Sequence, residues 1–140
     1  MSWVRVWIHL VFTTKNRTPF LVNEVRPAVL KHIEQNAKQK EIKLAIVNGH
    51  LEHIHCLIAL NREMSIAKTA QLIKGESSFW INKHKLTPDK FMCQDDYWAQ
   101  GVGEKEYKQV HDYIAGQEEH HRKTSYKEEY DMLLKTEQWG

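Results

Sequence analysis

Cysteine, proline and glycine are all scarce in this 140-residue sequence, with two, three and six residues respectively. Two cysteines are too few for a disulfide framework, so we expect a reducing, cytoplasmic setting. The low proline and glycine content excludes a collagen-like or low-complexity chain. No apolar run reaches the roughly 20 residues that cross a bilayer. The N-terminus also lacks the pattern of a cleavable signal, so we expect no membrane partner.

A large excess of charge of one sign is also absent, because the net charge is only +2. The charge is nevertheless unevenly distributed. Residues 1–90 contain 14 Lys and Arg against 7 Asp and Glu, whereas residues 91–140 contain 6 against 11. A basic body with an acidic tail favours a polyanionic partner, but two solvated faces of opposite sign explain the asymmetry equally well.

The pattern of apolar residues predicts alternating strands and helices in a single domain over residues 1–140. Strands are predicted at residues 3–14, 41–48, 53–60 and 97–102. A helix is predicted at 23–40 with Asn23 as its N-cap, and a second begins after Ser65 with Phe79 on its buried side. Asn48-Gly49 is typical of a tight turn between the second and third strands.

The order β-α-β-β-α-β predicts an α+β fold of the ferredoxin-like (RRM-like) split βαβ kind. In that arrangement two helices pack on one face of an antiparallel sheet, and the other face is left for a site. The core covers residues 1–102, and a further helix is expected at about 104–121. The capping box Ser125–Glu128 predicts a last short helix at about 125–135.

His53 and His55 are two residues apart in a predicted strand, so both imidazoles project from the same face. Ile54 and Cys56 then point to the opposite, core-facing side. Two imidazoles on a rigid strand can converge on one cation. The alternative is that both are polar residues on a solvated face, and the spacing alone does not exclude it.

The helix at about 104–121 offers a third ligand. On a helical wheel, Val110 and Ile114 belong to the apolar stripe, whereas Tyr113 lies to one side of it. Gln117 is four residues after Tyr113, so the phenol and the amide lie one turn apart on one edge. One helix can therefore bring a nucleophile and a neutral oxygen ligand to the same cation, unless Tyr113 is simply exposed on an amphipathic helix.

Other motifs are weaker. A zinc site of His50, His53 and His55 lacks a cysteine or carboxylate at matching spacing. The signature of the histidine-triad hydrolases requires a third histidine where Leu57 stands. Neither KGESS nor GVGEK matches a Walker loop, so no nucleotide cofactor is expected.

Four segments together resemble one family along nearly the whole chain: HLVFTTKNRTPFL, HIHCLI, LIKGESSFW and YIAGQEEHH. They are similar to the small HUH-type tyrosine transposases of bacterial insertion sequences and their REP-associated relatives. In that family His–hydrophobe–His supplies metal ligands, here His53 and His55, and Tyr-x-x-x-Gln supplies the nucleophile and a ligand, here Tyr113 and Gln117. Glu52 stands where the family more often has Asp or Asn.

The resemblance implies a metal-dependent enzyme, with Mg²⁺ or Mn²⁺, that cleaves and rejoins single-stranded DNA at hairpin-marked ends through a 5′-phosphotyrosine. Likeness to the insertion-sequence members implies a homodimer in which the tyrosine helix of one subunit can serve the histidine pair of the other, whereas likeness to the REP-associated relatives implies a monomer. A non-catalytic module that binds nucleic-acid hairpins and a metal-dependent phosphodiester hydrolase remain as alternatives. Phosphate contacts are expected from basic residues of the first half: Arg5, Lys15, Arg17, Lys68 and Lys74.

Overall fold

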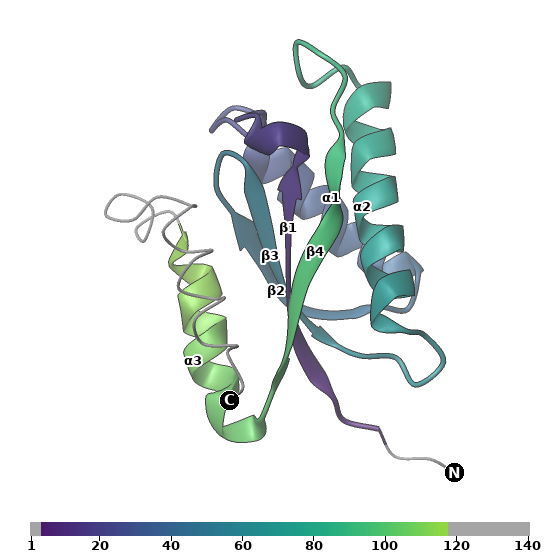
Figure 1. Ribbon diagram of the computed structural model, residues 1–140, viewed down its shortest axis with the longest axis vertical. Helices are drawn as coiled ribbons and strands as arrows, with labels where there is room; N and C mark the ends of the chain where they lie inside the picture. The colour runs from purple at the N-terminus through teal and green to yellow at the C-terminus, as the bar shows by residue number, and fades with distance from the viewer. Residues whose placement is uncertain (1–3, 118–140) are drawn as a thin grey trace.

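Four antiparallel strands in the order β2-β3-β1-β4 form the sheet of the computed structural model, which describes residues 4–117 (Figure 1). The elements in chain order are β1 (Trp7–Thr14), η1 (Lys15–Arg17), α1 (Arg26–Gln39), β2 (Lys43–Gly49), β3 (His53–Ala59), α2 (Ile66–Lys83), β4 (Cys93–Val102) and α3 (Glu104–Ala115). This order and this sheet confirm the predicted α+β, ferredoxin-like fold.

The two faces of the sheet have different roles because side chains alternate along each strand. On β1, Ile8, Leu10 and Phe12 belong to the hydrophobic core that α1 and α2 cover. His9 and Val11 project to the other face, which α3 covers (Figure 1). Helices α1 and α2 therefore share one face as predicted, and the tyrosine helix lies on the other.

The predicted turn at Asn48-Gly49 is wrong, because both residues belong to β2 and the connection to β3 is residues 50–52. Gly49 pairs with Ile54, and a Cβ at Gly49 would collide with the backbone carbonyl of His53. Glycine is therefore required here by a close backbone approach within the hairpin and not by a turn. Asn48 is used by a tertiary contact with α3, described below.

Three smaller expectations also need correction. Val25, not Asn23, is the N-cap of α1, because the Asn23 side chain instead accepts a hydrogen bond from Arg26 at 2.7 Å. Phe79 is 61% exposed and does not lie on the buried side of α2. Strand β4 begins at Cys93, four residues before the predicted start of that strand at residue 97. In contrast, Ser65 caps α2 as predicted by accepting a hydrogen bond from the Lys68 amide.

Some expectations fall outside the described residues: the end of the tyrosine helix at 118–121, the capping box Ser125–Glu128, and the short helix at 125–135. Within residues 4–117, no helix is both long and apolar enough to cross a membrane.

Candidate functional site

The histidine pair lies on β3 with both side chains fully buried. His53 and His55 have ring centroids 5.0 Å apart, and neither ring belongs to the hydrophobic core. Ile54 and Cys56 belong to that core, on the other side of the sheet. The predicted alternation is therefore confirmed, although the two rings are covered by the protein and do not lie on a solvated face.

Helix α3 covers this face and brings Tyr113 and Gln117 to the histidines. The half-buried Tyr113 ring has its centroid 5.7 Å from that of His55, nearly perpendicular to it. Gln117, just beyond the end of α3, is fully buried, and its Oε1 lies 3.1 Å from Nε2 of His53. Two segments more than 50 residues apart in sequence therefore meet at one place.

Asn48 fastens the end of α3 to the sheet. Its Nδ2 donates to the carbonyl oxygens of Ile114 at 2.9 Å and of Ala115 at 3.1 Å. These carbonyls belong to the last turn of α3, where backbone acceptors lack partners within the helix. The adjacent Ile114 side chain is fully buried against the sheet. Asn48 therefore holds the helix next to Gln117.

The ring of His53 is oriented from both sides. Its Nδ1 lies 2.9 Å from the carboxylate oxygen Oε1 of Glu52, which can only accept, so Nδ1 carries a proton. The Gln117 amide is oriented by its Nε2, which donates to the Tyr113 carbonyl at 3.3 Å and so turns Oε1 toward His53. An amide oxygen cannot donate either. Nε2 of His53 therefore either carries a second proton and donates it to Oε1 of Gln117, or binds the same cation as that oxygen.

His55 is held in a similar way by a histidine from another strand. Its Nδ1 lies 2.8 Å from Nε2 of His9 on β1, and both rings are buried. Each member of the histidine pair thus has its Nδ1 engaged by a neighbour on the sheet, Glu52 for one and His9 for the other. This leaves Nε2 as the nitrogen of each ring that is suited to a metal ligand.

The residues fit a small divalent cation. Two cis ligands of an octahedral ion at about 2.1 Å lie about 3.0 Å apart, close to the 3.1 Å between His53 Nε2 and Gln117 Oε1. Imidazole and amide ligands are neutral, so an ion bound to them would keep its charge for a substrate. Within residues 4–117 no three His, Cys, Asp or Glu side chains are grouped to hold a metal. Among residues 4–117, the third ligand beside the two histidines would be the amide of Gln117.

Two polar residues of the site, His9 and Glu52, are not among the residues predicted for it, and a third, Asn48, is predicted to be in a turn. His9 alternates with core residues of β1, a signal that places it off the core face but not beside His55. Glu52 differs from the residue that the family more often has before the first histidine, and Asn48 precedes a glycine as in a tight turn. The partners of all three come from strand register and helix docking, which local sequence patterns do not specify.

The basic residues predicted to contact DNA are distributed over different parts of the molecule. Lys15 and Arg17 form η1, directly after β1, where the Thr14 amide donates to the Glu52 carbonyl at 2.9 Å. These two cations therefore lie at the end of the sheet that carries His53. Arg5 precedes the opposite end of β1 and forms an exposed ion pair with Glu104 at 3.0 Å.

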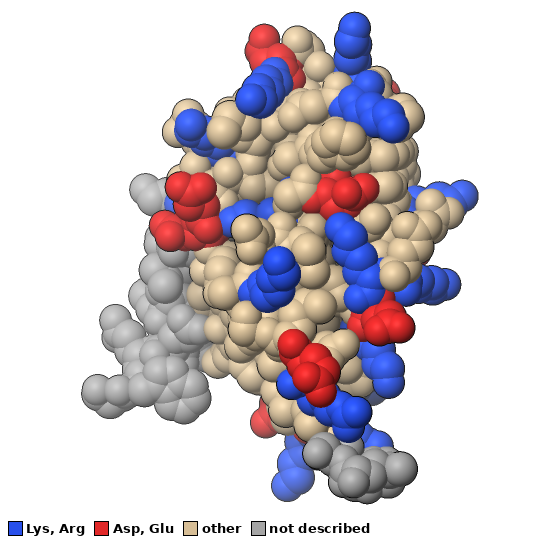
Figure 2. All heavy atoms as spheres, turned by 90° about the vertical axis from the view of Figure 1, so that its right-hand side faces the viewer, with Lys and Arg blue, Asp and Glu red and all other residues tan. Residues whose placement is uncertain are grey.

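Lys68 and Lys74 lie on α2, on the other face of the sheet. Figure 2 looks onto that side and shows Lys and Arg side chains over the whole surface, with acidic side chains between them. Basic residues therefore do not form one continuous patch on this face. The five predicted residues do not make a single cluster.

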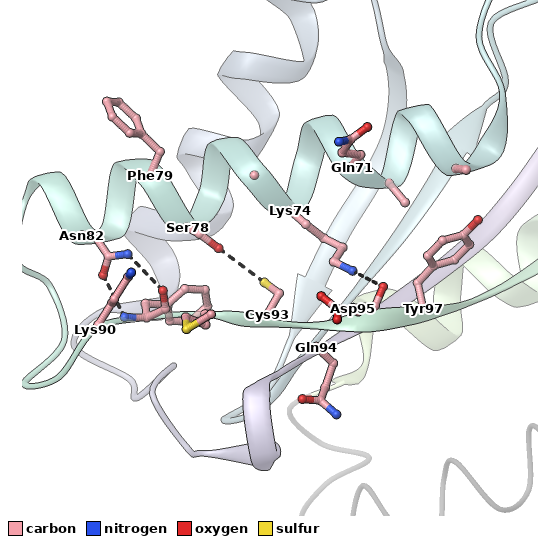
Figure 3. A pocket seen from close by; sticks show the side chains of 15 residues that line it. Gln71, Lys74, Ser78, Phe79, Asn82, Lys90, Cys93, Gln94, Asp95 and Tyr97 are labelled. Carbon is pink, nitrogen blue, oxygen red and sulfur yellow. Dashed lines mark hydrogen bonds between the residues drawn. The ribbon is translucent and has the colours of Figure 1, made fainter.

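Lys74 also lines a cavity of about 470 Å³ between α2 and the first half of β4 (Figure 3). Its Nζ reaches across the cavity and donates to the Asp95 carbonyl at 2.8 Å. Burial raises the pKa of the nearby Cys93 thiol, while the hydrogen bond between Ser78 and Cys93 and the charge of Lys74 act in the opposite direction. None of the four predicted active-site residues lines this cavity, so it is separate from the histidine site.

Comparisons with known proteins give consistent findings. Residues 2–117 match the family described as IS200-like transposases. The transposase for insertion sequence element IS200 of Salmonella typhimurium strain LT2 is 28% identical over 115 residues, which cover 78% of this chain and 74% of that protein. The transposase of the same element in Salmonella typhi is similar to the same extent.

Two solved structures share the fold. A putative transposase from Deinococcus radiodurans R1 superposes with a TM-score of 0.64 at 24% identity, over 84% of this chain and 95% of that one. A REP-associated tyrosine transposase bound to a REP hairpin also has a TM-score of 0.64, at 17% identity, over 86% of this chain and 72% of that one. At these identities the likeness bears on the fold alone.

Proposed function

This chain belongs to the IS200-like transposase family, and from that premise we propose that it cuts and rejoins single-stranded DNA through Tyr113. The observation that carries the proposal is the meeting of His53, His55, Tyr113 and Gln117, from a strand and a distant helix, on the face of the sheet opposite α1 and α2. A packed core does not require two imidazoles, a phenol and an amide in contact. Phosphodiester transfer through a tyrosine gives each of these groups a use, because the phenol can attack and the imidazoles and the amide can hold a cation.

In the proposed reaction Tyr113 loses its phenolic proton, and its oxygen forms a bond to phosphorus while the P–O3′ bond breaks. The departing 3′ oxygen takes up a proton, which leaves a free 3′-OH and a 5′-phosphotyrosine. Attack by another 3′-OH reverses the step and joins new ends, so no external energy source is needed. A Mg²⁺ or Mn²⁺ ion held by His53, His55 and Gln117 would polarise the scissile phosphate and offset charge on the departing oxygen.

The other residues of the site position these groups. Glu52 and His9 hold the two imidazoles by their Nδ1 atoms, and Asn48 holds the end of α3. Because Tyr113 and Gln117 are on the same short segment, an error in docking α3 displaces the nucleophile and a ligand together. Small misplacements of reacting groups are costly, since catalysis depends on near-attack geometry.

We propose single-stranded DNA with hairpins as the substrate. The REP-associated relative bound to a REP hairpin supports this choice. The phosphates nearest the cleavage site would be contacted by Lys15 and Arg17, because η1 adjoins the end of the sheet that carries His53. Lys68 and Lys74 would contact DNA that extends past α2, whereas the ion pair with Glu104 makes Arg5 the weakest candidate.

The test is formation of a covalent adduct. The protein is incubated with Mn²⁺ and a hairpin oligonucleotide labelled at either end, and products are separated on a denaturing gel. We expect an adduct only with the 3′-label, because a 5′-phosphotyrosine retains the DNA downstream of the cut. Tyr113→Phe should abolish it. Tyr107→Phe is the matched control, since Tyr107 is on the same helix but packs against Trp7, with ring centroids 4.8 Å apart.

Each other result supports a different function. Cleavage without any adduct indicates a hydrolase that uses water, and hairpin binding without cleavage indicates a non-catalytic binding module. An adduct that survives Tyr113→Phe but not Tyr107→Phe transfers the nucleophile to Tyr107. His53→Ala should stop cleavage while hairpin binding persists; loss of binding as well contradicts a role limited to the metal.

The homodimer stays a prediction, and mixing experiments test whether the site is shared. The 3.1 Å approach of Gln117 to His53 within one chain supports a site completed in cis. Equal amounts of Tyr113→Phe and His53→Ala proteins are mixed and assayed for the adduct. A site completed in cis predicts no recovery, whereas recovery of adduct together with a dimeric sedimentation mass demonstrates exchange of the helix between subunits.

The proposed phosphate contacts are tested by the salt dependence of hairpin binding. Each phosphate contact contributes about 0.7 to 0.9 to the slope of log K against log salt. Lys15→Gln should make this salt dependence shallower by the amount expected for about one phosphate contact, and it should weaken binding of every hairpin tested. Arg5→Gln, the matched control, should leave the slope unchanged because Arg5 already pairs with Glu104. Equal effects of the two substitutions contradict the assignment.

A further inference from the structure

We propose that His9 is a positioning residue that holds His55 in the tautomer able to bind a metal ion, an inference that rests on the proposed function. His9 comes from β1, more than 40 residues before His55 in sequence. It is not one of the ligands, and the sequence pattern places it only on the side of β1 that faces away from the core. Its role is therefore to act through another residue.

The contact between the two rings is a directed hydrogen bond. Nε2 of His9 and Nδ1 of His55 are 2.8 Å apart, whereas the ring centroids are 5.0 Å apart and the planes differ by 25°. The nitrogens are much closer than the centroids, so they point at one another across nearly parallel rings. His9 is 4% exposed and His55 is not exposed at all, so water does not compete for this bond.

His9 is itself held rigidly. It lies in the middle of β1, paired with Leu57 on one side and Gln100 on the other. Its ring also makes a T-shaped contact with the ring of Trp98, with the centroids 5.0 Å apart and the planes at 81°. A ring fixed by both neighbouring strands and by an aromatic side chain can impose an orientation on its partner.

The direction of the hydrogen bond decides which nitrogen of His55 is available to a cation. If His55 Nδ1 donates and His9 Nε2 accepts, a neutral His55 has its lone pair on Nε2 and can bind a metal ion there. If His9 donates instead, a neutral His55 carries its proton on Nε2 and cannot. A ligating histidine generally donates its other N–H to a fixed acceptor, as His53 does to Glu52.

The tautomers are read directly by long-range ¹H–¹⁵N spectra of the metal-free, full-length protein, which distinguish protonated from unprotonated ring nitrogens. We expect the Nδ1 of His55 to be protonated and the Nε2 of both His9 and His55 to be unprotonated. A protonated Nε2 on His9 that donates to His55 overturns the proposal. This measurement needs no variant, so it decides the question even if substitutions at His9 prevent folding.

Mn²⁺ binding measured by calorimetry gives a second readout. His9→Phe keeps a ring but removes the acceptor, and it should weaken Mn²⁺ binding by about 10- to 100-fold. His9→Gln provides an amide oxygen that can accept from Nδ1 and should recover most of the affinity. Ile8→Val, the matched control, changes the neighbouring residue on the core side of β1 and should bind Mn²⁺ like the unmodified protein.

The outcomes separate this proposal from the proposed function. Unchanged Mn²⁺ affinity in His9→Phe, an equal loss in Ile8→Val, or no recovery in His9→Gln contradicts the role of His9. If the unmodified protein binds no Mn²⁺ at all, the metal-dependent function fails, and the ring spectra still establish whether His9 accepts from His55.

Discussion

The contact between Asn48 and the end of α3 provides a quantitative test of how the active site is assembled. Asn48→Ala removes a donor to two carbonyls, at 2.9 and 3.1 Å. A hydrogen bond contributes about 0.5–1.5 kcal/mol net. Because one of the two bonds is only partly buried and the other is exposed, we expect Asn48→Ala to reduce the free energy that holds α3 on the sheet by about 1–2 kcal/mol. That corresponds to about a 5- to 30-fold fall in the ratio of docked to undocked α3.

The assay compares Asn48→Ala with Asn82→Ala. Asn82 also makes two hydrogen bonds to backbone, donating to the Phe91 carbonyl at 3.0 Å and accepting from the Phe91 amide at 2.8 Å, but it anchors the connection from α2 to β4. Urea unfolding should show a similar loss of stability in both variants. The rate of adduct formation, measured well below the unfolding transition, should fall only in Asn48→Ala.

A third variant isolates the donor. Asn48→Asp keeps the oxygen that accepts from the Gly49 amide but places a negative charge against the last carbonyls of α3, where a helix end is already electronegative. It should slow adduct formation at least as much as Asn48→Ala. Equal rates of adduct formation in Asn48→Ala and Asn82→Ala would mean that docking of α3 does not depend on the Asn48 contact.

Four further predictions concern Cys56, two glycines and Glu52. Burial raises the pKa of the Cys56 thiol from 9.0 to about 12. Above about pH 9 the unfolded chain therefore loses this proton while the folded chain keeps it, and the unfolding free energy falls by up to about 1.4 kcal/mol per pH unit. Cys56→Ala should make the unfolding free energy, measured by urea titration, fall less steeply with pH, and an unchanged slope contradicts this assignment. Gly49→Ala places a Cβ against the His53 carbonyl and should lower the free energy of unfolding by about 1–3 kcal/mol in the same assay. Gly75→Ala, in open space on α2, should instead gain about 0.5–1 kcal/mol. Glu52→Ala leaves His53 Nδ1 without this acceptor and should weaken Mn²⁺ binding by roughly tenfold or more in calorimetry; full affinity contradicts the positioning role of Glu52.

The family, the element order and the side of β3 on which the histidines lie could all be predicted from patterns along the chain. Strand alternation is a local property with a period of two, so His53 and His55 could be assigned to one face without knowing the neighbours of β3. The spacing of Tyr113 and Gln117 on one helix is local in the same sense. The resemblance to small tyrosine transposases rested on segments spread along the chain, and the match over residues 2–117 confirms it.

The orientation of those groups depends on contacts that form when the chain folds. His9 meets His55 because β1 pairs with β3 in one particular register, and Asn48 meets α3 because the helix packs back over the sheet. Register and docking depend on contacts between residues far apart in sequence, which a propensity for a turn cannot report. Asn48-Gly49 therefore resembles a turn in sequence, whereas in the fold Asn48 holds the end of α3 and Gly49 allows the close approach of the His53 backbone.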